Sequence, residues 1–192
     1  MFGQINYIYS NRLNFGKVRT EENALWSFAP HDVAVILRLI GQSPTQVSAT
    51  GGSYLNSDLA DTTVSNLRFS DESRAHIFVS WLHPFKEQRL VVVGDEKMAI
   101  FNDVAAYGEK LQLYPQRVEF DGTLPILKKE DAEFVDHANT EPLREECNHF
   151  LECIQSRNQP LTDAQSGIDV LKVLHACQQS IEQNGAPVSL RN

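Results

Sequence analysis

His31 and Asp32 are the residues of this chain best suited to acid–base chemistry. They follow Pro30, a residue that favours the first turn of a helix, so both are predicted to lie in a helical first turn. The partial positive charge of a helix N-terminus disfavours a protonated imidazole. A neutral imidazole can accept a proton, so His31 is a candidate general base. The alternative is that both residues are structural. His31 would then cap or pack at a helix start, and the negative charge of Asp32 would interact favourably with the helix dipole.

Trp81 to Lys86 is a second candidate segment, because it ends a predicted strand with an aromatic ring, a histidine and a lysine. Such a strand end could form a polar cleft wall, although a solvated strand end has the same composition. The other histidines have no ligand-like spacing, which argues against a metal site. No G-x-G-x-x-G or P-loop pattern occurs, so the chain offers no visible cradle for a dinucleotide or nucleotide phosphate.

Residues 1–41 are predicted to form a strand followed by a helix. Apolar and polar residues alternate from Ile5 to Phe15, which places Arg12 and Asn14 on one polar face of the strand. The helix has apolar residues at the i, i+3, i+4, i+7 spacing of a buried face, and Gly41 is its predicted stop.

Residues 45–120 are predicted to form a sheet of strands joined by short connections, which link antiparallel neighbours. The predicted strands are Gln46–Leu55, Thr62–Phe69, Arg74–Leu82, Gln88–Gly94, Lys97–Phe101 and Lys110–Tyr114. The run Leu90 to Val93 is apolar on both faces, which indicates that both faces of this strand are covered. Helices could cover one face, and a second subunit could cover the other.

Residues 121–139 are predicted to be a charged surface loop, and residues 141–185 to be helical. Leu143, Cys147, Phe150, Leu151 and Ile154 form one apolar stripe. For the last helix we predict Thr162 as N-cap, Gln165 reaching back to it, and a stop at Asn184-Gly185. The whole chain is therefore predicted to be a single α+β domain, with a mostly antiparallel open sheet and helices on one face.

Composition excludes several classes of protein. The net charge of −8 disfavours nucleic acid as a partner, and no apolar run approaches the length of a membrane helix. No secretory leader precedes the first strand, which favours the cytoplasm. The three cysteines are too few and too poorly spaced for a disulfide framework or a zinc site, and are expected to pack as small apolar residues.

Several motifs together resemble the C-terminal domain of the glucose–fructose oxidoreductase, inositol dehydrogenase and related proteins, the Gfo/Idh/MocA family. The motifs are Arg12-Leu13-Asn14-Phe15-Gly16, Asn23 to Asp32, Trp81 to Arg89, Glu146 to Phe150, and Thr162-Asp163-Ala164. Within the family, the sequence is most similar to the UDP-N-acetylglucosamine and UDP-N-acetylglucosaminuronate 3-dehydrogenases.

The resemblance implies a domain like that of dihydrodipicolinate reductase, which binds a sugar or UDP-sugar and forms a homo-oligomer through its sheet. It implies NAD or NADP as cofactor of the full-length enzyme, bound by a Rossmann domain that this chain does not contain, so that the chain alone binds neither. His31 matches a family histidine at the reacting sugar carbon, while Ser27 stands where the family carries an aspartate. We expect His31 to transfer a proton. The candidates for sugar or phosphate contact are Arg12, Asn14, Asn23, Trp26 and Lys86.

A different class of function is also open: a self-associating binding or assembly module without a redox role. The missing cofactor half supports it. An in-frame Rossmann segment upstream of Met1 would favour the enzyme, and a true start codon there would favour the module.

Overall fold

A nine-stranded sheet forms the frame of the molecule in a computed structural model that describes residues 2–55 and 58–190. The strand order is β10-β7-β6-β5-β1-β4-β3-β2-β11. The strands are β1 (Ile5–Leu13), β2 (Gln46–Gly52), β3 (Thr62–Arg68), β4 (Arg74–Ser80), β5 (Glu87–Gly94), β6 (Met98–Asn102), β7 (Leu111–Tyr114), β10 (Glu133–Phe134) and β11 (Val188–Ser189). All neighbours are antiparallel except β1 and β4, which are parallel.

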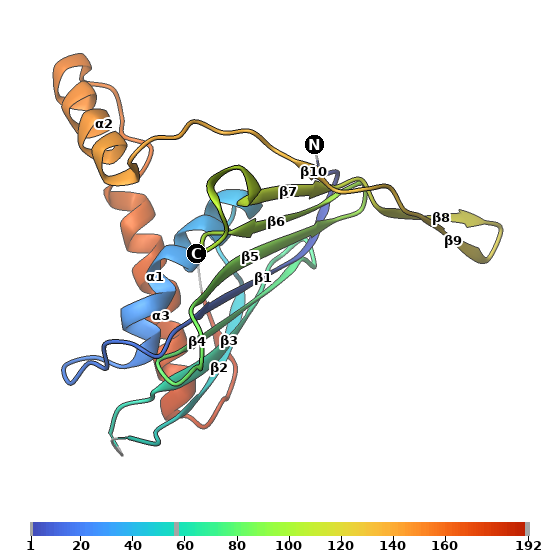
Figure 1. The fold of residues 1–192 in the computed structure, drawn as a ribbon. Coiled ribbons are helices and arrows are strands. Elements are labelled where there is room, and N and C mark those ends of the chain that lie inside the picture. The colour runs from blue at the N-terminus through green and yellow to red at the C-terminus, as the bar shows by residue number, and fades with distance from the viewer. Residues whose placement is uncertain (1, 56–57, 191–192) are drawn as a thin grey trace.

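Two helices lie on one face of this sheet, as Figure 1 shows: α1 (Ala24–Ile40) and α3 (Ala164–Glu182). Helix α1 packs on β1, β3 and β4, and α3 packs on β2, β11 and α1. The core lies between these helices and the sheet, with Ile8, Ile36 and Ile77 among its fully buried side chains. The prediction of an α+β fold with a mostly antiparallel open sheet and helices on one face is confirmed.

The remaining elements lie outside this layered core. Helix α2 (Pro142–Ser156) stands away from the sheet, and β8 (Arg117–Asp121) and β9 (Leu124–Lys128) form a separate hairpin (Figure 1). A short 3-10 helix, η1 (Tyr107–Glu109), precedes β7. The apolar stripe predicted on α2 is exposed, since α2 has no buried residue in the described structure.

Most predicted strands and both helix stops match the structure, because they rest on local signals. Gly41 ends α1 with a left-handed backbone and donates its N–H to the Leu37 carbonyl at 2.9 Å. Gly185, also left-handed, follows α3 and donates to the Ser180 carbonyl at 2.8 Å.

Two local predictions were wrong, and one strand was missed. Residues 121–139 are not an irregular loop, since they contain β9 and β10, which find hydrogen-bonding partners in β8 and β7. The N-cap of α3 is Asp163 rather than Thr162, because the Asp163 carboxylate accepts the Ser166 N–H at 2.8 Å. Strand β11 was missed: it is two residues long, and its pairing with β2 is a long-range contact.

Candidate functional site

His31 lies two turns inside α1 and not in its first turn, which corrects the sequence prediction. The helix begins at Ala24, and Pro30 lies within it. Asn23 is the N-cap: its side-chain oxygen accepts the Trp26 N–H at 3.2 Å. Because the field of a helix N-terminus fades within the first turn, the dipole argument for a neutral His31 does not apply.

The imidazole of His31 is exposed, and it makes no hydrogen bond or ring contact with another described residue. Ser27 precedes it by one helical turn, while Val35 and Leu39 follow at i+4 and i+8, so all four share one side of α1. Val35 and Leu39 are exposed apolar residues. His31 is thus free to meet a ligand or a partner, on a side of α1 that becomes apolar toward its C-terminus.

Asp32 points the other way and is only 4% exposed. Its carboxylate accepts the Ser10 hydroxyl at 2.7 Å and the Arg12 guanidinium at 2.7 and 3.2 Å. The polar face predicted for β1 is therefore turned toward α1. The predicted role of Asp32 as an answer to the helix dipole is wrong, because Asp32 forms a buried ion pair that joins α1 to β1.

A cavity of about 410 Å³, which we call the α1 groove, lies beside this ion pair. It separates α1 from the part of the sheet formed by β5, β6 and β7. Its lining residues are Phe2, Arg12, Asp32, Val35, Leu39, Gln88, Arg89, Leu90, Val92, Ala99, Phe101, Asp103 and Leu111. The groove is mostly apolar with a few polar groups at one end, a composition typical of binding sites.

The polar groups of the α1 groove are connected to one another. In the amide orientation that satisfies both neighbours, Gln88 accepts from Arg12 Nη1 at 3.3 Å and donates to Asp103 at 3.1 Å. Asp103 in turn pairs with Lys110 at 2.8 Å. The two cations of this network, Arg12 and Lys110, are therefore both paired with carboxylates. Arg12, a candidate for phosphate contact, is already engaged by Asp32.

Asn23 and Trp26, two further candidates for sugar contact, face α3. Asn23 donates to the Gln178 side chain at 2.8 Å, and the Trp26 indole N–H donates to the same oxygen at 3.3 Å. The Trp26 ring also meets the His175 ring edge-on, with centroids 4.9 Å apart. These contacts couple the first turn of α1 to the middle of α3.

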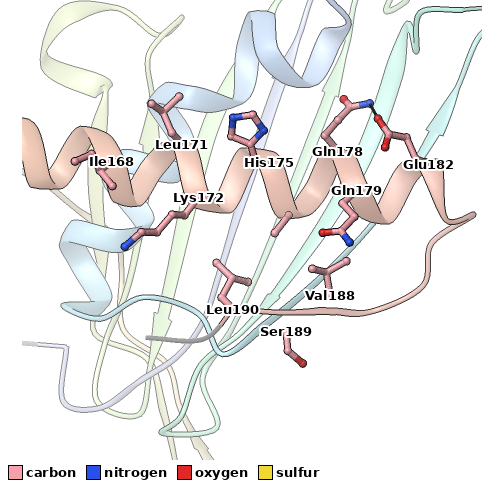
Figure 2. A pocket seen from close by; sticks show the side chains of 11 residues that line it. Ile168, Leu171, Lys172, His175, Gln178, Gln179, Glu182, Val188, Ser189 and Leu190 are labelled. Carbon is pink, nitrogen blue, oxygen red and sulfur yellow. Dashed lines mark hydrogen bonds between the residues drawn. The ribbon is translucent and has the colours of Figure 1, made fainter.

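A second, wider hollow of about 740 Å³ lies along α3, and we call it the α3 hollow. Figure 2 shows Lys172, His175, Gln179 and Glu182 on the helix, opposite Val188 and Leu190 of the C-terminal segment. Its polar groups are of mixed charge, and His31 does not line it. We place the candidate site at the α1 groove and the neighbouring side of α1. His31 does not itself line the groove, but Val35, one turn further along the same side of the helix, does.

Asn14 and Lys86 lie at one end of the sheet. Asn14 follows β1 and its backbone N–H donates to the Ser80 carbonyl at 3.1 Å, while Lys86 directly precedes β5. Leu13 pairs with Glu87, which brings these two chain segments together. The six predicted site residues thus occupy four places rather than one cavity. Arg12 lies in the groove, Asn23 and Trp26 face α3, and Asn14 and Lys86 lie at the sheet end, while His31 stands on the exposed side of α1.

The described residues do not fit a dinucleotide. A pyrophosphate needs a Gly-rich turn at a helix N-terminus. The N-caps of α1, α2 and α3 are instead Asn23, Glu141 and Asp163, and no glycine precedes them in these turns. Among the described residues, no cluster of His, Cys, Asp or Glu could hold a metal ion. The described helices include none that is long and apolar enough to cross a bilayer.

Sequence reasoning missed the partners that organise this region. Ser10 showed only as a polar residue in the strand alternation, and Gln178 carried no signal. Val35 and Leu39 could have been found, since their spacing from His31 places them on the same side of any helix.

Comparisons with known proteins agree with this architecture. Residues 4–100 match the family described as the GFO/IDH/MocA C-terminal domain. No curated protein sequence matches the chain.

Solved structures with a similar fold include sugar-modifying enzymes. UDP-N-acetylglucosamine 3-dehydrogenase GnnA from Acidithiobacillus ferrooxidans is 22% identical with a TM-score of 0.80, over 95% of this chain and 56% of the other. The WlbA dehydrogenase from Bordetella pertussis, in complex with NADH and UDP-GlcNAcA, is 17% identical with a TM-score of 0.74, over 100% and 57%. An aldose-aldose oxidoreductase from Caulobacter crescentus is 15% identical with a TM-score of 0.76, over 98% and 56%. At these identities the likeness shows the fold alone, and the chain spans little more than half of each neighbour.

Proposed function

The chain belongs to the GFO/IDH/MocA C-terminal domain family, and on that premise we propose that it is the substrate-binding and oligomerising domain of an NAD(P)-dependent oxidoreductase. The substrate is a sugar or nucleotide sugar, whose hydroxyl-bearing carbon exchanges a hydride with the nicotinamide. The observation that carries the proposal is the exposed His31 on α1, one turn from Val35, which lines the α1 groove. Solved structures that share this fold over nearly the whole chain include UDP-N-acetylglucosamine 3-dehydrogenase GnnA and the WlbA dehydrogenase in complex with NADH and UDP-GlcNAcA.

His31 supplies the proton chemistry of this proposal. Oxidation of a sugar alcohol to a ketone requires that the hydroxyl oxygen lose a proton, and the free imidazole of His31 is an acceptor for it. The redox chemistry belongs to the nicotinamide, which the described residues of this chain do not fit. The enzyme therefore needs a dinucleotide-binding unit against the surface that carries His31.

Self-association is the second part of the proposal, and the open face of the sheet supports it. This face is the one opposite α1 and α3, and it has an apolar band across its central strands. The band consists of Tyr7, Tyr9, Val64, Phe78, Val91 and Ile100. His76 stacks on Tyr9 with ring centroids 5.3 Å apart, and burial lowers its pKa. Arg74, which pairs with Tyr7, lies on the same face beside the band. An apolar band of this size on a monomer is unusual and favours an interface.

The test is to measure turnover with the dinucleotide-binding unit present, joined to the chain or supplied separately. UDP-N-acetylglucosamine, its uronate and simple aldoses are the substrates to try with NAD and NADP. Positioned acid–base catalysis contributes about 10²–10⁴-fold, so His31→Asn should lower kcat by that factor with little change in KM. Arg38→Ala, an exposed change later on the same helix, is the matched control. If kcat of His31→Asn stays within a few-fold of the parent, His31 is not the base.

One observation favours the rival, a self-associating module without redox activity. No side chain in the described structure orients the imidazole of His31, whereas a general base is usually held by a hydrogen bond. A chain that self-associates but shows no turnover with any of these substrates and cofactors would establish the rival.

A further inference from the structure

The β8–β9 hairpin is a projecting element that the rest of the described chain leaves uncovered. Figure 1 shows it extending beyond the end of the sheet, on the side of the molecule opposite α1 and α3. Gly122, with a φ of +61°, forms its tight turn. Among the described elements, β8 and β9 pack substantially only on each other. An isolated two-stranded hairpin is marginally stable in water, so this one needs a cover.

The two faces of the hairpin differ in chemistry. On one face Val118 pairs with Leu127 and Phe120 pairs with Pro125, so this face is entirely apolar. Its three large side chains are 48%, 69% and 63% exposed for Val118, Phe120 and Leu127. We call this the apolar face of the hairpin.

On the opposite face of the hairpin, charged side chains pair with one another. Glu119 forms an ion pair with Arg117 of the same strand at 2.8 Å and another with Lys128 of β9 at 3.6 Å. These charges satisfy one another and leave the apolar face without a charged group. The surface that covers the apolar face must therefore be apolar and uncharged as well.

The chain exposes more surface than a compact monomer of its mass would. The excess indicates that a partner covers part of this surface. Its accessible surface is 12144 Å², whereas a compact monomer of 21.7 kDa would expose about 9,200 Å². The excess of about 2,900 Å² is more than one partner's share of a standard interface, about 800 Å². A single partner at the α1 groove would leave part of this excess exposed.

We infer that the hairpin is an arm that lays its apolar face on the open sheet face of a second copy of this chain. The inference rests on the self-association proposed above. In Figure 1 the hairpin projects past one end of the sheet, away from the label of α1, so we do not take a unit seated on α1 as its cover. The open face of a second copy carries the required apolar band, including Tyr7, Tyr9 and Val64. A two-fold pair is self-complementary, so each copy would receive the arm of the other.

The test is sedimentation velocity of the purified chain over a range of concentrations. Phe120→Asp and Leu127→Asp should each raise the dissociation constant of the pair about 30-fold or more, as expected for buried anchors of an interface. Ile126→Asp is the matched control, because Ile126 lies on the charged face of the same hairpin. It should change the dissociation constant by less than about 3-fold, in keeping with the near-neutral contacts that surround anchors. Equal urea midpoints for all three variants, under conditions where they are monomeric, would show that the core is intact.

Val64→Asp, on the open sheet face, separates this inference from the self-association on which it rests. Loss of association in Val64→Asp, Phe120→Asp and Leu127→Asp, with Ile126→Asp unaffected, supports the arm. Loss in Val64→Asp alone keeps the sheet interface and overturns the arm. Loss in the hairpin variants alone shows that the arm packs elsewhere and overturns the open face as its acceptor. A wild-type chain that stays monomeric at high concentration overturns both, while the turnover assay for His31 remains a separate test.

Discussion

Removing the Arg12 guanidinium should destabilise the fold strongly, because Asp32 would then hold a buried charge without its cation. In the structure, Arg12 donates two hydrogen bonds to the Asp32 carboxylate, and Ser10 donates the third. Arg12→Met keeps the aliphatic stem in the groove and removes the donors. The Ser10 hydroxyl would then be the one hydrogen-bond donor left to the Asp32 carboxylate. The Asp32 side chain is only 6% exposed, so little water could replace the lost donors.

The size of the effect follows from this geometry. Breaking a buried ion pair by removing one partner costs about 3–5 kcal/mol. The Arg12 side chain is 22% exposed, so water can reach the vacated space, and we expect the lower end, about 3 kcal/mol. Replacing both partners, as in Arg12→Met with Asp32→Leu, should restore most of this loss, because an apolar pair of similar volume is often as stable as a buried ion pair.

Urea unfolding followed by the fluorescence of Trp26 and Trp81 measures these free energies, at one protein concentration so that association contributes equally. The double-mutant cycle should give a coupling of about 2–3 kcal/mol between Arg12 and Asp32. Arg38→Met, an exposed control on the same helix, should change stability by less than about 0.5 kcal/mol. A loss below about 1 kcal/mol for Arg12→Met, or purely additive single variants, would refute the reasoning and return Arg12 to the candidates for substrate contact.

Two further outcomes are expected of the isolated chain. Burial raises the pKa of the Cys177 thiol to about 11, so iodoacetamide at pH 8 should label exposed Cys147 and leave Cys177 unmodified until urea is added. Mass spectrometry of the native chain checks this, and labelling of both at similar rates would contradict it. Asn23→Ala removes the α1 cap and the bond to Gln178, and should lower the unfolding free energy by about 1–2 kcal/mol at an unchanged m-value. An unchanged urea midpoint together with weaker sugar binding would instead make Asn23 a substrate contact.

Local sequence signals were enough to place most of the secondary structure. The alternation from Ile5 onward, the apolar run at Leu90 and the glycine at position 41 each act through neighbouring residues, whose backbone preferences the sequence shows directly. Short connections between strands likewise predicted antiparallel neighbours. That prediction was wrong for β4 and β5, because the distant strand β1 lies between them in the sheet. The family resemblance also rests on contiguous motifs, and the match over residues 4–100 agrees with it.

Contacts between distant segments were decided only by the tertiary structure. Helix α1 begins at Ala24 and continues through Pro30, because burial of Ala24, Leu25 and Ala29 in the core outweighs the roughly 3 kcal/mol that an interior proline costs. That shift removed His31 from the helix N-terminus and, with it, the electrostatic argument for its role.

The same physical reason explains the polar candidates. Arg12 and Asp32 are 20 residues apart, and Asn23 and Gln178 are 155 apart, so no local preference records either pair. A strand pattern shows that two faces differ, but which face meets a helix depends on what packs there. In β1 the polar face meets α1, because Ser10 and Arg12 donate hydrogen bonds to the buried Asp32 carboxylate of that helix.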